Sequence, residues 1–143
     1  MVAMFSKSSA QSGADLCKST NRPATILVVE DSNDTRNVLN FSLMKNGYKV
    51  VTATNGQEAL GVALRERPDL ILMDLNMPLM DGLAATERIR EHEELRQVPI
   101  LAVTAYDTYG MKEAALEAGC DGYIKKPIDF NRLDTILRRI LSC

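Results

Sequence analysis

The sequence predicts an α/β fold in which a doubly wound sheet of five parallel strands is covered by five helices. Three observations support this prediction. From Pro23 onward, short apolar segments alternate with longer segments of helical periodicity. The short segments are apolar at consecutive positions, which is typical of strands that are covered on both faces. The connections between segments are short, which favours parallel strands joined by crossover helices.

The first strand and the first helix are indicated by an apolar run followed by helical spacing. The segment 25–29, TILVV, predicts a buried strand. A helix is expected over 33–46, because Leu39 and Leu43 lie at helical spacing. Gly47 stands where a glycine commonly ends a helix.

The second and third strands flank another amphipathic helix. YKVVTA at 48–53 predicts the second strand, and DLILM at 69–73 predicts the third, which leads into Asp74. A helix is expected over 56–66, with Pro68 just beyond it. Its apolar face consists of Ala59, Leu60, Ala63 and Leu64.

The middle of the chain predicts a loop, a helix and the fourth strand. The segment LNMPLMDG at 75–82 has the composition of a loop. PILAV at 99–103 predicts the fourth strand. The helix between them, over 82–93, is expected to turn inward Leu83, Thr86 and Ile89.

The last part of the chain predicts the fourth helix, the fifth strand and the fifth helix. Gly110 is placed early in the fourth helix, where it would cost about 1 kcal/mol relative to Ala, and Gly119 ends that helix. GYIK at 122–125 predicts the fifth strand, and 129–141 the last helix. The apolar stripes of these two helices are Met111, Ala114, Ala115 and Ala118, and Leu133, Ile136, Leu137 and Ile140.

Length and composition indicate one soluble domain without a nucleic-acid or membrane partner. The chain has 143 residues, of which 45% are hydrophobic and 25% charged. The formal net charge of −2 provides no basic field for nucleic acid or an anionic membrane. No apolar run approaches the roughly 20 residues of a membrane span. No signal peptide is recognisable, so we expect a cytoplasmic protein.

The N-terminal segment and the cysteines carry little chemical signal. Residues 1–22 are rich in serine and lack periodicity, so we expect a disordered tail followed by a domain over 23–143. The cysteines Cys17, Cys120 and Cys143 are odd in number and lack metal-site spacing, so we expect reduced thiols.

Reactive side chains follow four of the predicted strands. Glu30 and Asp31 follow the first strand, Asp74 the third, Thr104 the fourth and Lys126 the fifth. Because ligands of open α/β sheets bind beyond the carboxyl ends of the strands, we expect these side chains to meet at one edge. A single carboxylate, threonine or lysine there is usually a cap or a solvated residue. The occurrence of all these side chains at the same edge of the sheet favours a functional site.

The charges of this cluster indicate a bound cation. Three carboxylates within several Å of one another repel by about 1–4 kcal/mol per pair, and Lys126 supplies a single positive charge. A hard divalent cation would neutralise the rest, and oxygen ligands suit Mg²⁺. A catalytic zinc site is disfavoured, because the one histidine, His92, lies on a polar helical stretch.

The chain from about residue 24 onward resembles the receiver domain of two-component response regulators, above all single-domain, chemotaxis-regulator-like receivers. The segments that carry the resemblance occur in the family's order and spacing, and they are ILVVED at 26–31, LILMDLNMPLMDG at 70–82, AVTA at 102–105 and AGCDGYIKKP at 118–127. The resemblance implies a flavodoxin-like sheet with strand order 2-1-3-4-5.

The resemblance also implies roles for individual residues. Asp74 would accept a phosphoryl group, and Lys126 would contact it. Mg²⁺ would be bound by Asp74, by Asp31 directly, by Glu30 directly or through water, and by the backbone carbonyl of Asn76. The Lys126–Pro127 peptide bond would be cis.

A switch and a set of partners are implied as well. Thr104 and Tyr123 match the switch residues, and Asn76 and Tyr106 flank the phosphorylation site, where they would tune the lifetime of the phosphoryl group. The readout face would comprise the fourth helix, the fifth strand and the fifth helix. The partners would be a histidine kinase or phosphotransfer protein and a downstream target protein, and the chain would be a monomer or weak dimer.

Three other functions remain open. A Mg²⁺-dependent phosphatase of the haloacid-dehalogenase type needs a carboxylate two residues after its aspartate nucleophile, where this chain has Asn76. A receiver fold that is never phosphorylated would tolerate loss of the acidic pair, the threonine or the lysine, all of which are present. A DNA-binding regulator needs an output domain, and Arg138 and Arg139 form only a weak basic pair near the end of the chain.

Overall fold

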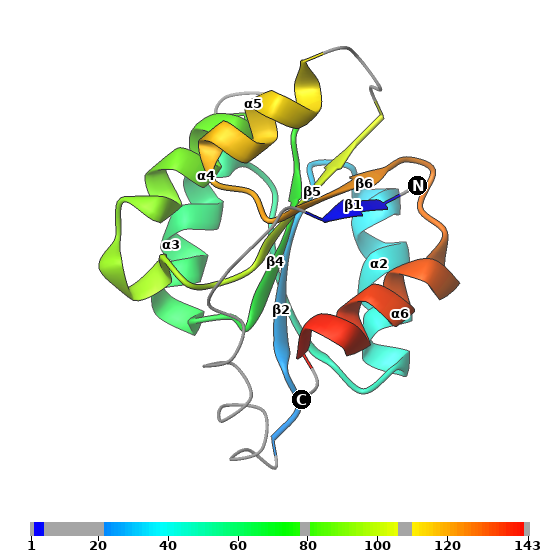
Figure 1. Ribbon diagram of the computed structural model, residues 1–143. Coiled ribbons are helices and arrows are strands. Elements are labelled where there is room, and N and C mark those ends of the chain that lie inside the picture. The colour runs from blue at the N-terminus through cyan, green and yellow to red at the C-terminus, as the bar shows by residue number, and fades with distance from the viewer. Residues whose placement is uncertain (1, 5–21, 78–80, 106–109, 142–143) are drawn as a thin grey trace.

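The sheet contains six strands in the order β1-β6-β5-β4-β2-β3 (Figure 1). The computed structural model describes residues 2–4, 22–77, 81–105 and 110–141. Within the series β6-β5-β4-β2-β3, each strand is parallel to its neighbours in that series. This confirms the predicted five-stranded parallel sheet and its order, and the strands are β2 (Thr25–Val29), β3 (Lys49–Ala53), β4 (Leu70–Asp74), β5 (Ile100–Thr104) and β6 (Gly122–Lys125).

Helices cover both faces of the sheet (Figure 1). Two of them, α2 (Asn33–Lys45) and α6 (Phe130–Leu141), pack on one face. The opposite face carries α3 (Gly56–Glu66), α4 (Gly82–Arg90) and α5 (Met111–Ala118). Each helix inserts apolar residues at helical spacing, which is why the periodicity of the sequence located them.

Alternate residues of each strand face alternate layers of the core. Leu27 and Val29 of β2 pack with α3 and α4, whereas Ile26 and Val28 pack with α2 and α6. All four side chains are at most 1% exposed. A continuously apolar strand is therefore required to fill both layers, and the polar residues collect where the strands end.

Residues Val2–Met4 form strand β1, which lies inside the segment 1–22 for which the sequence predicted a disordered tail. The strand runs antiparallel to β6, with Val2 opposite Ile124 and Met4 opposite Gly122. The physical reason is that β6 would otherwise be an edge strand with a row of unpaired backbone groups, which a short extended segment can satisfy. Residues 1 and 5–21 lie outside the described part of the chain.

Two helix boundaries differ by more than one residue from those predicted. The third predicted helix ends at Arg90, and a short 3-10 helix, η1 (Glu93–Leu95), follows it. Gly110 lies before α5 rather than inside it. Its φ of +93° belongs to the left-handed region, where a residue without a Cβ is favoured. The expected helix-weakening cost of Gly110 therefore does not apply.

Among the described residues, no helix combines the length and the apolar character that crossing a membrane requires.

Candidate metal centre

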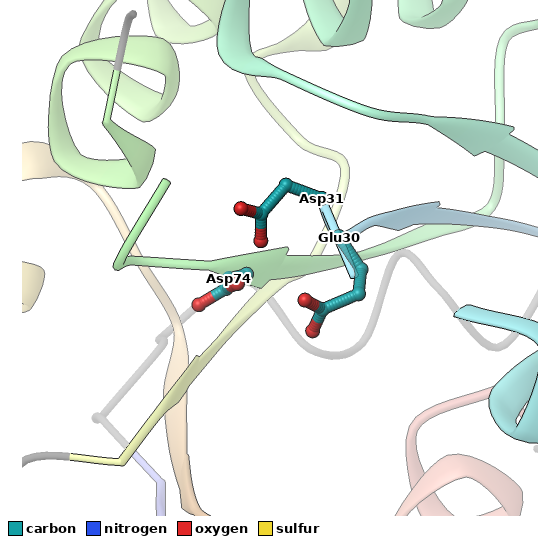
Figure 2. Close-up of side chains that lie close together, drawn as sticks. All are labelled: Glu30, Asp31 and Asp74. Atoms are coloured by element: carbon teal, nitrogen blue, oxygen red, sulfur yellow. The ribbon is translucent and has the colours of Figure 1, made fainter. Parts of the chain in front are cut away.

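Three carboxylates converge at the carboxyl ends of two neighbouring strands (Figure 2). Glu30 and Asp31 directly follow β2, and Asp74 is the last residue of β4. One oxygen from each side chain lies within 4.8 Å of the other two. The parallel register of β2 and β4 brings these residues together, as the sequence predicted. An all-oxygen donor set of this kind fits Mg²⁺, which retains waters and takes few protein carboxylates.

Burial makes this cluster costly to charge without a cation. Glu30 is 3% exposed and Asp74 is 2% exposed, whereas Asp31 is exposed. Desolvation is the largest influence on the Glu30 carboxyl and raises its pKa. The backbone N–H of Ser32, which donates to Glu30 Oε2 over 3.1 Å, opposes that pKa shift, and the nearby Asp74 charge adds to it.

Lys126 provides a positive charge to the cluster. Its Nζ lies 3.2 Å from Glu30 Oε1 and 3.5 Å from Asp74 Oδ2. The Lys126 backbone N–H donates to the carbonyl of Thr104, and the Lys126–Pro127 peptide bond is cis. Lys125, one residue earlier, is exposed. One ammonium against three carboxylates leaves an excess of negative charge that a divalent cation would neutralise.

Asn76 links the carboxylate of Asp74 to the hydroxyl of Thr104. Its backbone N–H donates to Asp74 Oδ1 over 3.0 Å. Its side-chain Nδ2 donates to Thr104 Oγ1 over 2.9 Å. Thr104 ends β5 beside β4 and is fully buried. Sequence reasoning placed Asn76 and Thr104 at the site but did not foresee the bond between them, because side-chain pairing across a loop leaves no periodic signal.

The structure describes one of the two tyrosines that the resemblance assigned to the site. Tyr123, on β6, is 7% exposed and belongs to the core layer that faces α3, α4 and α5. The side chain of Tyr123 is therefore largely buried in this structure. Tyr106 falls outside the described residues.

Sequence reasoning missed two residues that support the site. Arg36, on α2, donates from its guanidinium to the backbone carbonyl of Glu30 over 2.9 Å. Gly82 begins α4 against the end of β4, and a Cβ there would lie 2.3 Å from the carbonyl oxygen of Asp74. A glycine is therefore required for this close approach. The Asp81–Gly82 pair at the end of the predicted loop 75–82 was the available signal, and the sequence pattern indicated only a loop there.

Comparisons with known proteins agree with this geometry. A family model described as "Response regulator receiver domain" matches residues 26–138. The polar-differentiation response regulator DivK of Brucella anthropi is 38% identical over 120 residues, which cover 84% of this chain and 98% of DivK.

Solved structures of similar proteins also include a chemotaxis protein and a receiver domain. Chemotaxis protein CheY4 of Vibrio cholerae is 33% identical with a TM-score of 0.79, and the match covers 82% of this chain and 98% of that one. The receiver domain of the sensor histidine kinase PA1611 from Pseudomonas aeruginosa PAO1 is 39% identical with a TM-score of 0.78, over 83% and 98%. That structure has a magnesium ion coordinated in its active-site cleft.

Proposed function

The chain belongs to the response regulator receiver domain family, and we propose that it is a signalling switch that accepts a phosphoryl group on Asp74 in a Mg²⁺-dependent reaction. The observation that carries this proposal is the position of Asp74. Its carboxylate ends a buried strand, lies within 4.8 Å of oxygens of Glu30 and Asp31, and lies 3.5 Å from Lys126 Nζ. A phosphoryl group there would lie beside the Lys126 ammonium, and a cation held by the carboxylates would offset its remaining charge.

Transfer from a phosphohistidine donor forms one bond and breaks one. An Asp74 oxygen attacks phosphorus, the donor's N–P bond breaks, and the imidazole nitrogen retains the electron pair and takes up a proton. Glu30, Asp31, Asp74 and the backbone carbonyl of Asn76 would hold Mg²⁺, which offsets charge on the phosphoryl oxygens. Lys126 would contact a phosphoryl oxygen through its ammonium group.

Phosphorylation would be read through Thr104 and Tyr123. The Thr104 hydroxyl can donate a hydrogen bond to a phosphoryl group only when one is present. Its movement would change the packing of β6, where Tyr123 lies, and of the surface made by α5, β6 and α6. That surface would bind the downstream target protein. The receiver domain would act through this protein-binding surface, as a monomer or weak dimer.

The surface next to the cluster suits a protein donor such as a histidine kinase or phosphotransfer protein. A hollow of about 510 Å³ there is lined by Val38 of α2, by Lys126 and by Phe130, among others. On α2, Val38 is 51% and Phe41 72% exposed. Exposed apolar side chains beside a reactive site are typical of a docking surface.

The proposal is tested with a small phosphodonor. Incubation with acetyl phosphate and Mg²⁺ should add one phosphoryl group, detected by intact mass. Asp74→Asn should abolish the gain, and the exposed Asp34→Asn should retain it. No gain with any donor, small or protein, would instead favour a receiver fold that functions only as an interaction module.

Residues next to the site would set the lifetime of the phosphorylated state. Tyr106 is placed by the sequence two residues after Thr104. Its ring would shield the phosphoryl group from water. Dephosphorylation should therefore be faster in Tyr106→Ala than in the unsubstituted protein, and equal decay rates would rule out this role.

A further inference from the structure

Asn76 makes two hydrogen bonds that join the acceptor carboxylate to the switch hydroxyl. The backbone N–H reaches Asp74 Oδ1, and the carboxamide reaches Thr104 Oγ1. Asp74 and Thr104 end the adjacent strands β4 and β5, and they are 2% and 0% exposed. The bridge therefore lies where water competes little for either bond.

The Thr104 hydroxyl is an acceptor in this bridge. A hydroxyl has one proton to donate and two lone pairs to accept with. Because the carboxamide of Asn76 occupies a lone pair of Thr104 Oγ1, the hydroxyl proton is directed away from Asn76. A hydroxyl that accepts one hydrogen bond is also polarised toward donating another.

We propose that Asn76 is a positioning residue that aims the Thr104 hydroxyl at a phosphoryl group on Asp74. This inference rests on the proposed function and adds to it a direct coupling between the loop after β4 and the switch at the end of β5. Asn76 thereby sets how strongly Thr104 holds the phosphoryl group, in addition to flanking the acceptor.

The substitution Asn76→Ala isolates this role. It removes the carboxamide but keeps the backbone N–H that donates to Asp74 and the backbone carbonyl proposed as a Mg²⁺ ligand. Mg²⁺ affinity is measured separately for this variant, and binding of the analogue is compared at Mg²⁺ concentrations that saturate both proteins. The affinity for a phosphoryl analogue should fall, because Thr104 would lose its orientation.

A double-mutant cycle with beryllofluoride as the phosphoryl analogue tests the coupling. Titration calorimetry in saturating Mg²⁺ compares the unsubstituted protein, Asn76→Ala, Thr104→Val and the double variant. Asn76→Ala should weaken binding by about five- to tenfold, the effect of one hydrogen bond. In the Thr104→Val background, Asn76→Ala should change affinity by less than about twofold. In the Thr104→Ser background, which retains a hydroxyl, the loss should reappear.

Additive losses in all backgrounds would overturn the inference, because Asn76 would then act without Thr104. The exposed Asn131→Ala, on α6, is the matched control and should bind as the unsubstituted protein does. Failure of the proposed function gives a different result, since the unsubstituted protein would then bind no beryllofluoride and gain no phosphoryl group.

Discussion

At the scale of the residue, the buried position of the charged Glu30 carboxylate destabilises the folded protein when no metal is bound. The side chain is buried against the Asp74 carboxylate, and its pKa is raised by burial. Lys126 and the N–H of Ser32 compensate only in part, since both lower that pKa while the net direction is upward. Such a site is more stable with a cation than without one.

Neutralising Glu30 should therefore stabilise the metal-free protein. We expect Glu30→Gln to raise the free energy of unfolding by about 1 kcal/mol in EDTA at pH 7. This value is the lower end of the repulsion energy of one carboxylate pair, which the substitution removes. Saturating Mg²⁺ should stabilise the unsubstituted protein more than the variant. Urea unfolding with and without Mg²⁺ measures both. A variant that is less stable in EDTA would show that the Lys126 contact outweighs the repulsion.

The same carboxyl gives a pH dependence of known sign. Because its folded pKa is raised above 4.5, the folded state binds this proton more tightly than the unfolded chain. Its contribution to stability is therefore greatest below the unfolded pKa and is lost as pH rises through the folded pKa. In EDTA, the stability difference between Glu30→Gln and the unsubstituted protein should shrink as pH falls toward 4.5. A difference independent of pH would contradict this assignment.

At the scale of the element, α4 is held against β4 by the absence of a side chain. A Cβ on Gly82 would lie within 3 Å of three backbone atoms of Asp74 and Leu75, which cannot move away as a flexible side chain could. The start of α4 and the acceptor strand are therefore packed backbone to backbone. The position of Asp74 depends on this contact as well as on its own strand.

Two glycine-to-alanine substitutions separate this contact from general helix effects. Gly82→Ala should destabilise the protein by about 2–3 kcal/mol through overpacking and should slow phosphorylation by acetyl phosphate. Gly61 lies on α3, and a Cβ added there would meet no atom within 4 Å. Gly61→Ala should therefore raise the free energy of unfolding by about 0.5–1 kcal/mol and leave phosphorylation unchanged. Equal effects of the two substitutions on stability would show that α4 can move aside.

The exposed face of α2 gives a prediction about protein donors. The double substitution Val38→Ala and Phe41→Ala should slow phosphotransfer from a phosphorylated histidine protein by about tenfold or more, because truncated anchor residues typically cost over 1 kcal/mol each. Phosphorylation by acetyl phosphate should not change. Leu116→Ala, at the 52% exposed Leu116 of α5, is the control and should affect neither reaction. An equal loss with both donors would place the effect in the site rather than in docking.

At the scale of the whole molecule, the sequence was most informative where periodicity and burial agree. Apolar runs located the parallel strands, and the rule that ligands bind beyond strand ends predicted that Glu30, Asp31, Asp74 and Lys126 lie together. Features without a repeating pattern were not found. The bond from Asn76 to Thr104 and the close approach at Gly82 depend on loop geometry, and β1 depends on an edge that only the assembled sheet creates.

The pairing of strand β1 with β6 can be tested by truncation. Removing residues 1–21 should expose the edge of β6 and increase hydrogen exchange of amides within 122–125 by about tenfold or more. Amides of β2, in the interior of the sheet, should exchange as before. Unchanged exchange in β6 would show that β1 is not paired in solution, and a new dimer would show that a second copy can occupy the edge.

The pairing of Met4 with Gly122 also has a consequence for how the protein is made. Strand β1 precedes every other strand of the sheet in the chain, yet its partner β6 is the last strand to be made. The strands β3 to β6 are each made after β2, so the sheet would grow from β2 and β3 at one end toward β6, and β1 would join beyond β6. A long peptide fused ahead of Met1 would have to remain outside the sheet while that final strand docks.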